Sequence, residues 1–279
     1  MFNLYSSFFW SQLNGKNTLA KTFVHGDIQF QSKRILFLIN SIVTLKYSDY
    51  AHIACSNSKI GMSSASLNTV LKNGLTKKIV IFKNLRLAEL DDVERLIILR
   101  NRNVYYHIIG DTWLKKSSAI KKTRDLKRLS KKVENVVFKS IGLSVLQDSM
   151  MNEVLHLLQD GLIRKGVHSK EIGRLKTFLH SVRKMSKLED IDFIADLLYV
   201  DEAIVAAHIG IKVQSTYLYW LPSYDVKYSS ISPGQQLLLS ILGNAESAGI
   251  ELVDFGNGDE PYKRWFATGS LRSISGISF

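Results

Sequence analysis

The pattern of hydrophobic and polar positions in the first part of the chain is typical of short strands separated by polar breaks. The stretch 21–39 predicts two strands around the turn His25-Gly26-Asp27, and residues 77–85 predict another strand. Residues 88–102 carry Leu90, Val93, Leu96 and Ile97 at helical spacing, so we expect a helix there. The β-branched and aromatic run 103–110 then predicts a strand.

The second half of the chain has longer periodic segments. Residues 143–166 and 169–188 place apolar side chains three and four apart, which predicts two amphipathic helices. Strands are expected on both sides of the tight turn Asp201-Glu202. His208, in the second of these strands, is interpreted as a packed core residue rather than a catalytic base.

A strand–helix–strand unit follows. The strand 215–225 is expected to end at Pro222, and a helix over 232–249 has Ser232 at its N-cap and a proline in its first turn. The strand 250–255 comes next, and a last strand closes the chain. A strand–helix–strand crossover makes its two strands parallel, and ligands bind at the carboxyl ends of such strands. The order predicts an α/β fold with a mixed sheet.

Composition supports a folded chain of 279 residues with 46% hydrophobic and 22% charged residues. Cys55 is the single cysteine, which excludes an internal disulfide and suits a reducing compartment. No secretory signal is visible, and the most apolar window, 35–45, is too short to span a bilayer. These features predict a cytoplasmic protein.

Positive charge is concentrated in residues 115–132, which hold nine Lys or Arg against Asp125 and so carry eight of the net twelve charges. This segment marks the boundary between two expected domains, 1–118 and 119–279. Its basic side chains suit the solvated face of a helix or an anionic membrane surface. Nucleic acid is a less favoured partner, because no aromatic residue is interleaved with the charges to stack on bases.

Two segments at the ligand-binding end of the crossover carry candidate chemistry. The turn Ser232-Pro233-Gly234 opens a helix whose free N–H groups and dipole suit a phosphate, although an ordinary helix start has the same features. In the stretch "DFGNGDEPYKRWFA" (254–267), Asp254 or Asp259 can orient or deprotonate an acceptor amine. Tyr262 can protonate a departing thiolate, and Lys263 can bind an anionic substrate group or face solvent.

The same stretch carries a family resemblance. Together with Ala206-Ala207, the pattern Tyr219, Pro222, Tyr224-Asp225, and the helix start Pro233-Gly234, it resembles the GNAT-type acetyltransferases associated with cellulose and exopolysaccharide biosynthesis. The resemblance covers about residues 125–270. It departs from the wider superfamily at Ser229, Ser230 and Ser232, where basic residues or glycines are usual.

The resemblance implies a GNAT-like acyl-CoA N-acyltransferase fold, with two tandem GNAT-like halves related to Fem aminoacyltransferases. It implies an acetyl-CoA or other acyl-CoA donor and no metal. The pyrophosphate would lie at Ser232, Gly234, Gln235 and Gln236, and the pantetheine arm along the strand containing Tyr219 and Leu221. The acceptor would meet Asp49, Tyr50, Tyr217 and Glu260.

The implied reaction is direct attack of an acceptor amine or hydroxyl on the thioester. The expected acceptor is a sugar, cell-envelope or exopolysaccharide precursor, at the cytoplasmic side of the inner membrane. Two alternatives are a Fem-like transferase that uses aminoacyl-tRNA and a non-catalytic binding protein of the same fold. Against the former, the chain shows no extended heptad insertion of the kind that Fem-like enzymes often carry.

Overall fold

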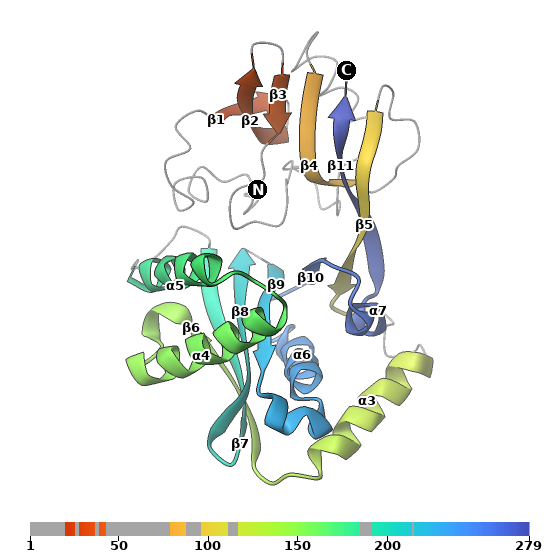
Figure 1. The fold of residues 1–279 in the computed structure, drawn as a ribbon. Coiled ribbons are helices and arrows are strands. Elements are labelled where there is room, and N and C mark those ends of the chain that lie inside the picture. The colour runs from red at the N-terminus through yellow and green to blue at the C-terminus, as the bar shows by residue number, and fades with distance from the viewer. Residues whose placement is uncertain are drawn as a thin grey trace. The chain divides into compact units, whose positions relative to one another are not determined.

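The computed structural model describes residues 20–25, 28–36, 39–42, 79–87, 96–110, 117–184, 191–213 and 215–278 (Figure 1). The chain divides into two compact units. Unit 1 contains β1 to β4, β11, residues 256–260 and β5 as far as Tyr105; unit 2 contains residues 106–255 and 261–268. Each unit is described by itself.

Unit 1 is built from strands. β1 (Ala20–His25) and β2 (Ile28–Leu36) pair antiparallel, with His25 opposite Ile28. β3 (Ile39–Ile42) pairs with β2 and runs parallel to β4 (Ile79–Leu87), and β11 (Gly269–Ser278) pairs antiparallel with β4. The strands expected at 21–39, at 77–85 and at the end of the chain are confirmed.

The helix expected over 88–102 is wrong where the structure describes it. β5 (Leu96–Ile108) is one continuous strand that begins inside the expected helix and includes the strand expected at 103–110. The apolar run Leu96-Ile97-Ile98-Leu99 fits a helix as well as a buried strand, and its pairing with β11 stabilises the strand. Residues 88–95 lie outside the described residues.

Unit 2 is centred on a mixed sheet. β6 (Val136–Gly142), β7 (Ile191–Val200), β8 (Ala203–Val213) and β9 (Thr216–Tyr224) pair antiparallel in sequence order. β10 (Leu252–Asn257) lies beside β9 and parallel to it, after the crossover helix α6 (Pro233–Asn244). The expected parallel crossover is therefore confirmed.

Helices cover this sheet. α4 (Asp148–Arg164), which follows the short η4 (Leu143–Val145), and α5 (Ser169–Lys184) confirm the two expected amphipathic helices. Residues 204–211 of β8 are all buried, so both faces of that strand are covered; α4 and α6 both pack against it. α3 (Ser117–Ser130), η5 (Val226–Ile231) and α7 (Pro261–Phe266) complete the unit (Figure 1). None of the helices in the described ranges is long and apolar enough to cross a membrane.

Three local predictions can be compared with the structure. The turn between β7 and β8 places Asp201 and Glu202 at φ 47° and 72°, as a two-residue hairpin requires. Ser232 lies at the N-cap of α6, but its φ is 53° and its side chain makes no capping hydrogen bond. β9 continues past Pro222 to Tyr224, so the expected end of this strand is wrong. A proline is tolerated there because β9 has left β10 by that point.

Candidate functional site

The strands β9 and β10 separate soon after they begin. Their parallel pairing joins Thr216 to Leu252, Tyr217 to Val253 and Leu218 to Asp254. β9 then continues to Tyr224 and β10 to Asn257 without further pairing between these two described strands. The edge of β9 beyond Leu218 therefore offers backbone donors and acceptors to an extended ligand, in the manner of an added strand.

β9 also carries a bulge at this point. Ile209 of β8 pairs with Leu221, whereas Ile211 pairs with Leu218. Between these two pairs β9 therefore advances by three residues and β8 by two. The extra residue lies opposite Gly210. A Cβ atom on Gly210 would lie 2.0 Å from the Tyr217 hydroxyl oxygen, so only glycine fits beneath the tyrosine. β-bulges are frequent next to active sites, where they redirect backbone groups.

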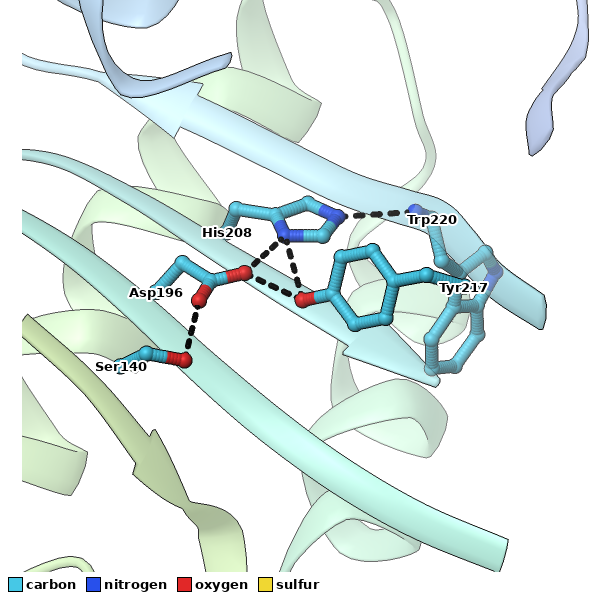
Figure 2. A network of polar contacts seen from close by, with 5 residues as sticks. All are labelled: Ser140, Asp196, His208, Tyr217 and Trp220. Atoms are coloured by element: carbon cyan, nitrogen blue, oxygen red, sulfur yellow. Dashed lines mark hydrogen bonds and ion pairs between the residues drawn. The ribbon is translucent and has the colours of Figure 1, made fainter. Parts of the chain in front are cut away.

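A buried polar network lies beside the bulge (Figure 2). Asp196 on β7, His208 on β8 and Tyr217 on β9 are 3%, 0% and 1% exposed. Asp196 Oδ1 accepts a hydrogen bond from Ser140 Oγ at 2.7 Å. Asp196 Oδ2 accepts from the Tyr217 hydroxyl and lies 3.1 Å from His208 Nδ1. The buried carboxylate is thus surrounded by hydrogen-bond donors from three strands.

The hydrogen bonds fix the protonation of His208. The backbone N–H of Trp220 donates to His208 Nε2 at 2.9 Å, so Nε2 is an acceptor and the proton is on Nδ1, facing Asp196. Burial lowers the pKa of His208, although Asp196 raises it in part. Burial, and then Asp196, raise the pKa of Tyr217 well above its ordinary value. Both shifts favour the neutral forms of His208 and Tyr217.

Aromatic side chains connect this network to α7. The Tyr219 ring stacks on the His208 ring, with centroids 4.2 Å apart and planes 14° from parallel. The Tyr219 ring also makes edge-to-face contacts with the rings of Phe255 on β10 and Tyr262 on α7, at centroid distances of 6.2 and 6.4 Å. Burial raises the pKa of the Tyr219 phenol well above its ordinary value. This cluster brings the strand predicted to hold pantetheine against the predicted general acid.

The predicted catalytic residues are divided between the units. Asp254 and Lys263 lie in unit 2, each 4% exposed, and Tyr262 is half-buried against Tyr219. Asp259 and Glu260 belong to unit 1, where the Tyr105 hydroxyl donates to Asp259 Oδ1 at 2.7 Å. No described contact tests the role of any of them, so these roles stay predictions.

The predicted phosphate site lies at the start of α6. Gly234 packs beside the Tyr224 ring, since a Cβ there would be 3.4 Å from Tyr224 Cδ1. Gln236 is buried and its amide donates to the Ile231 carbonyl at 2.6 Å, which stabilises the turn into the helix. The side-chain oxygen of Gln235 is buried and has no hydrogen-bond partner among the described residues. Ser232 and Leu221 are half-buried.

The predicted acceptor residues are placed only in part. Tyr217 is buried, and its hydroxyl is taken by Asp196 rather than facing an open crevice. Its predicted contact with the acceptor stays a prediction. Asp49 and Tyr50 lie outside the described residues. The interpretation of His208 as a buried, hydrogen-bonded residue is confirmed.

Two features were missed in the sequence. Asp196 stands between Ala195 and Leu197 in the middle of a mostly apolar strand, which was a signal that it has buried partners. Arg164, at the end of α4, lies 5.5 Å from the centre of the Tyr224 ring and donates to the Tyr224 carbonyl at 2.9 Å. It supplies a cation next to the ring on which Gly234 packs, where residues 229–232 have none.

The fold has counterparts among solved structures. L-PGS from Bacillus licheniformis is 12% identical, with a TM-score of 0.59 over 98% of this chain and 87% of that one. FemX is 11% identical, with a TM-score of 0.58 over 98% and 92%. The C-terminal domain of a putative lysylphosphatidylglycerol synthetase from Agrobacterium fabrum is 10% identical, with a TM-score of 0.57 over 96% and 85%. Identities this low show the fold alone, and no curated protein matches the chain.

Family membership follows from the second half of the chain. The family described as "Acetyltransferase (GNAT) domain" matches residues 121–264, which is 144 of the 279 residues. This range contains the crossover β9–α6–β10, the bulge and the separation of the two parallel strands. The chain belongs to the GNAT acetyltransferase-domain family.

Proposed function

We propose that this chain transfers an acyl group from acetyl-CoA, or another acyl-CoA, to an amine or hydroxyl of a sugar, cell-envelope or exopolysaccharide precursor. The observation that carries the proposal is the separation of β9 from β10 after Leu218 and Asp254. It leaves a strand edge next to the Tyr219–Tyr262 contact, where an extended thioester can lie.

The donor is proposed to lie along β9 and to reach the start of α6. Its pantetheine arm pairs with the backbone of Tyr219 and Leu221. Its pyrophosphate meets the first turn of α6 at Ser232, Gly234 and Gln235. One observation supports this position: the Arg164 guanidinium lies beside Tyr224, the ring against which Gly234 packs.

The reaction is proposed as one direct displacement. The acceptor nitrogen or oxygen attacks the thioester carbonyl, the carbon–sulfur bond breaks, and the thiolate takes a proton from the Tyr262 hydroxyl. The acceptor loses its own proton to a carboxylate, for which Asp254 and Asp259 are the candidates. Lys263 and Glu260 are assigned to the acceptor, together with Asp49 and Tyr50. The contact of Tyr262 with Tyr219 is the observation that supports its role.

Transfer from an aminoacyl-tRNA is the second candidate. The observation in its favour is the similarity to FemX and to L-PGS over almost the whole chain. It uses the same attack on an activated carbonyl but needs a nucleic-acid surface. Sequence and fold are also compatible with a binding protein that does not catalyse transfer.

An anionic membrane surface is the proposed partner of α3. Residues Arg124, Lys127, Arg128 and Lys131 are exposed, as is Ile120 at 49%. With Thr123, these side chains line a shallow depression of about 500 Å³. On another side of the helix, Leu126 is buried and Lys122 lies 4.2 Å from the centre of the Trp265 ring, so α3 is held with its basic residues outward. An exposed apolar residue among cations suits lipid headgroups. With this partner, the protein is proposed to act at the cytoplasmic face of the inner membrane.

Titration of the purified chain with acetyl-CoA and with aminoacyl-tRNA tests the donor. Calorimetric binding of acetyl-CoA, together with release of free thiol when an acceptor is added, would support the proposal. Binding of aminoacyl-tRNA alone would favour the second candidate. If neither ligand binds, the chain is not an acyltransferase of either kind. A Lys263→Ala variant with unchanged turnover and acceptor affinity would remove Lys263 from the site.

Vesicles test the partner of α3. Sedimentation with phosphatidylglycerol vesicles is expected, and sedimentation with phosphatidylcholine vesicles is not. A variant with Lys127, Arg128 and Lys131 changed to Gln should lose about 1 kcal/mol of membrane affinity per charge. Binding to duplex RNA in preference to vesicles would assign the surface to nucleic acid instead.

A further inference from the structure

The bulge in β9 gives one backbone N–H an unusual partner. In a regular antiparallel pair of strands, each N–H that faces the neighbouring strand donates to a backbone carbonyl of that strand. At the bulge, the Trp220 N–H donates instead to the side chain of His208 on β8. His208 thus supplies an acceptor for the Trp220 N–H, which the extra residue of β9 would otherwise leave without a hydrogen bond.

His208 is fixed from three directions. Its Nε2 accepts from Trp220, its Nδ1 lies 3.1 Å from Asp196 Oδ2, and its ring stacks on Tyr219. Figure 2 shows how Asp196 and Tyr217 close the side of the ring opposite Trp220. Because the side chain is fully buried, the ring has no room to turn, and the 219–220 peptide is held with it.

The orientation of this peptide determines where its carbonyl points. All peptide bonds of the described chain are trans, and the N–H and C=O of a trans peptide point in opposite directions. The Trp220 N–H points to the imidazole of His208, so we infer that the Tyr219 carbonyl points away from β8 and its imidazole. That is the side on which β10 pairs with Thr216 to Leu218 and then departs.

We propose that His208 is a positioning residue for the acyl donor. By holding the Trp220 N–H, it turns the Tyr219 carbonyl into the gap between β9 and β10, where this carbonyl accepts a hydrogen bond from the amide N–H of the donor nearest the thioester. Asp196 keeps the proton of His208 on Nδ1 and so keeps Nε2 available as the acceptor. This inference rests on the proposed acyl-CoA donor.

Two substitutions of His208 separate its two hydrogen bonds. In His208→Gln, the side-chain oxygen reaches the place of Nε2 and can still accept from Trp220. In His208→Asn, the shorter amide reaches the place of Nδ1 and can donate to Asp196, but nothing accepts from Trp220. Both variants lose the stacked ring, so they serve as controls for each other. Ser140→Ala removes a donor to Asp196 at the exposed strand β6 and leaves Trp220 untouched.

Two probes separate positioning from stability. Coenzyme A carries the pantetheine amides, whereas adenosine 3′,5′-bisphosphate lacks them. Calorimetry with the full-length chain should show that His208→Asn binds coenzyme A about tenfold more weakly than the unmodified protein, the value of one hydrogen bond. Its affinity for the bisphosphate should be unchanged. His208→Gln and Ser140→Ala should bind both probes within about threefold of the unmodified protein.

Three results would overturn the inference. One is an unchanged coenzyme A affinity in His208→Asn. Another is an equal loss for both probes, which would mean that His208 only stabilises the fold. The third uses the unmodified protein, so folding of a variant does not enter: a coenzyme A analogue with an ester in place of the amide nearest the thiol should bind about tenfold more weakly, and equal binding contradicts the proposal. If the unmodified chain fails to bind coenzyme A at all, the proposed function fails first and the inference with it.

Discussion

Substituting Gly210 by alanine perturbs the centre of the buried network. The new Cβ would lie 2.0 Å from Tyr217 Oη, 2.2 Å from Tyr217 Cζ and 2.7 Å from His208 Cε1. These distances are far below van der Waals contact, so the tyrosine ring must move. Tyr217 is 1% exposed and cannot move into solvent without breaking its hydrogen bond to Asp196.

The expected loss of stability is large. Overpacking of this kind costs about 1–3 kcal/mol, and leaving a buried acceptor without its donor costs about 1–3 kcal/mol more. The lower chain entropy of alanine offsets about 0.5–1 kcal/mol. Gly210→Ala should therefore destabilise unit 2 by about 1–5 kcal/mol, a large part of the 5–15 kcal/mol that is typical of a domain.

Urea unfolding followed by circular dichroism measures this loss as a lower midpoint. Because the chain has two units, hydrogen exchange of peptides from β8 and β9 reports on unit 2 alone. Gly173→Ala is the matched control: this exposed glycine in α5 has nothing within 4 Å of the new Cβ, and the change should stabilise by about 0.5–1 kcal/mol. Equal midpoints for Gly210→Ala and the unmodified protein, with the control shifted as expected, would refute the packing described for Tyr217.

Three other predictions follow from single contacts. Gly161→Ala places a Cβ 2.2 Å from Ser223 Oγ and should lower stability by about 1–3 kcal/mol; adding Ser223→Ala should restore most of it, and a double-mutant cycle in urea without such coupling would contradict this. Burial lowers the pKa of His208 below its ordinary 6.5, so the unfolded chain takes up this proton first. The free energy of unfolding should therefore be highest above pH 6.5 and decrease below it by up to about 1.4 kcal/mol per pH unit. The slope should be smaller in His208→Gln; identical slopes for the two proteins between about pH 5 and 7 would show that His208 is not the group responsible. Tyr262→Phe should slow acyl transfer by about 10²-fold or more with unchanged acetyl-CoA affinity, and an unchanged kcat would exclude Tyr262 as the general acid.

The candidate site could be predicted from the sequence only where its residues share one local segment. The start of α6 was recognisable because Ser232, Pro233 and Gly234 are consecutive and each has a known position at a helix start. Asp196, His208 and Tyr217 are 12 and 9 residues apart along the chain, on three strands, and no local pattern joins them. Their meeting depends on the register of β7, β8 and β9, including one extra residue at the bulge.

The sequence by itself determined the parts that depend on neighbouring residues: the periodicity of α4 and α5, the turn at Asp201-Glu202, and the order β9, α6, β10 that makes two strands parallel. The tertiary structure decided the rest. It made residues 96–102 a strand, carried β9 through Pro222, and turned the Trp220 N–H toward His208. The physical reason is that strand pairing and burial are interactions between distant parts of the chain, and their free energy exceeds the small local preferences that a sequence pattern records.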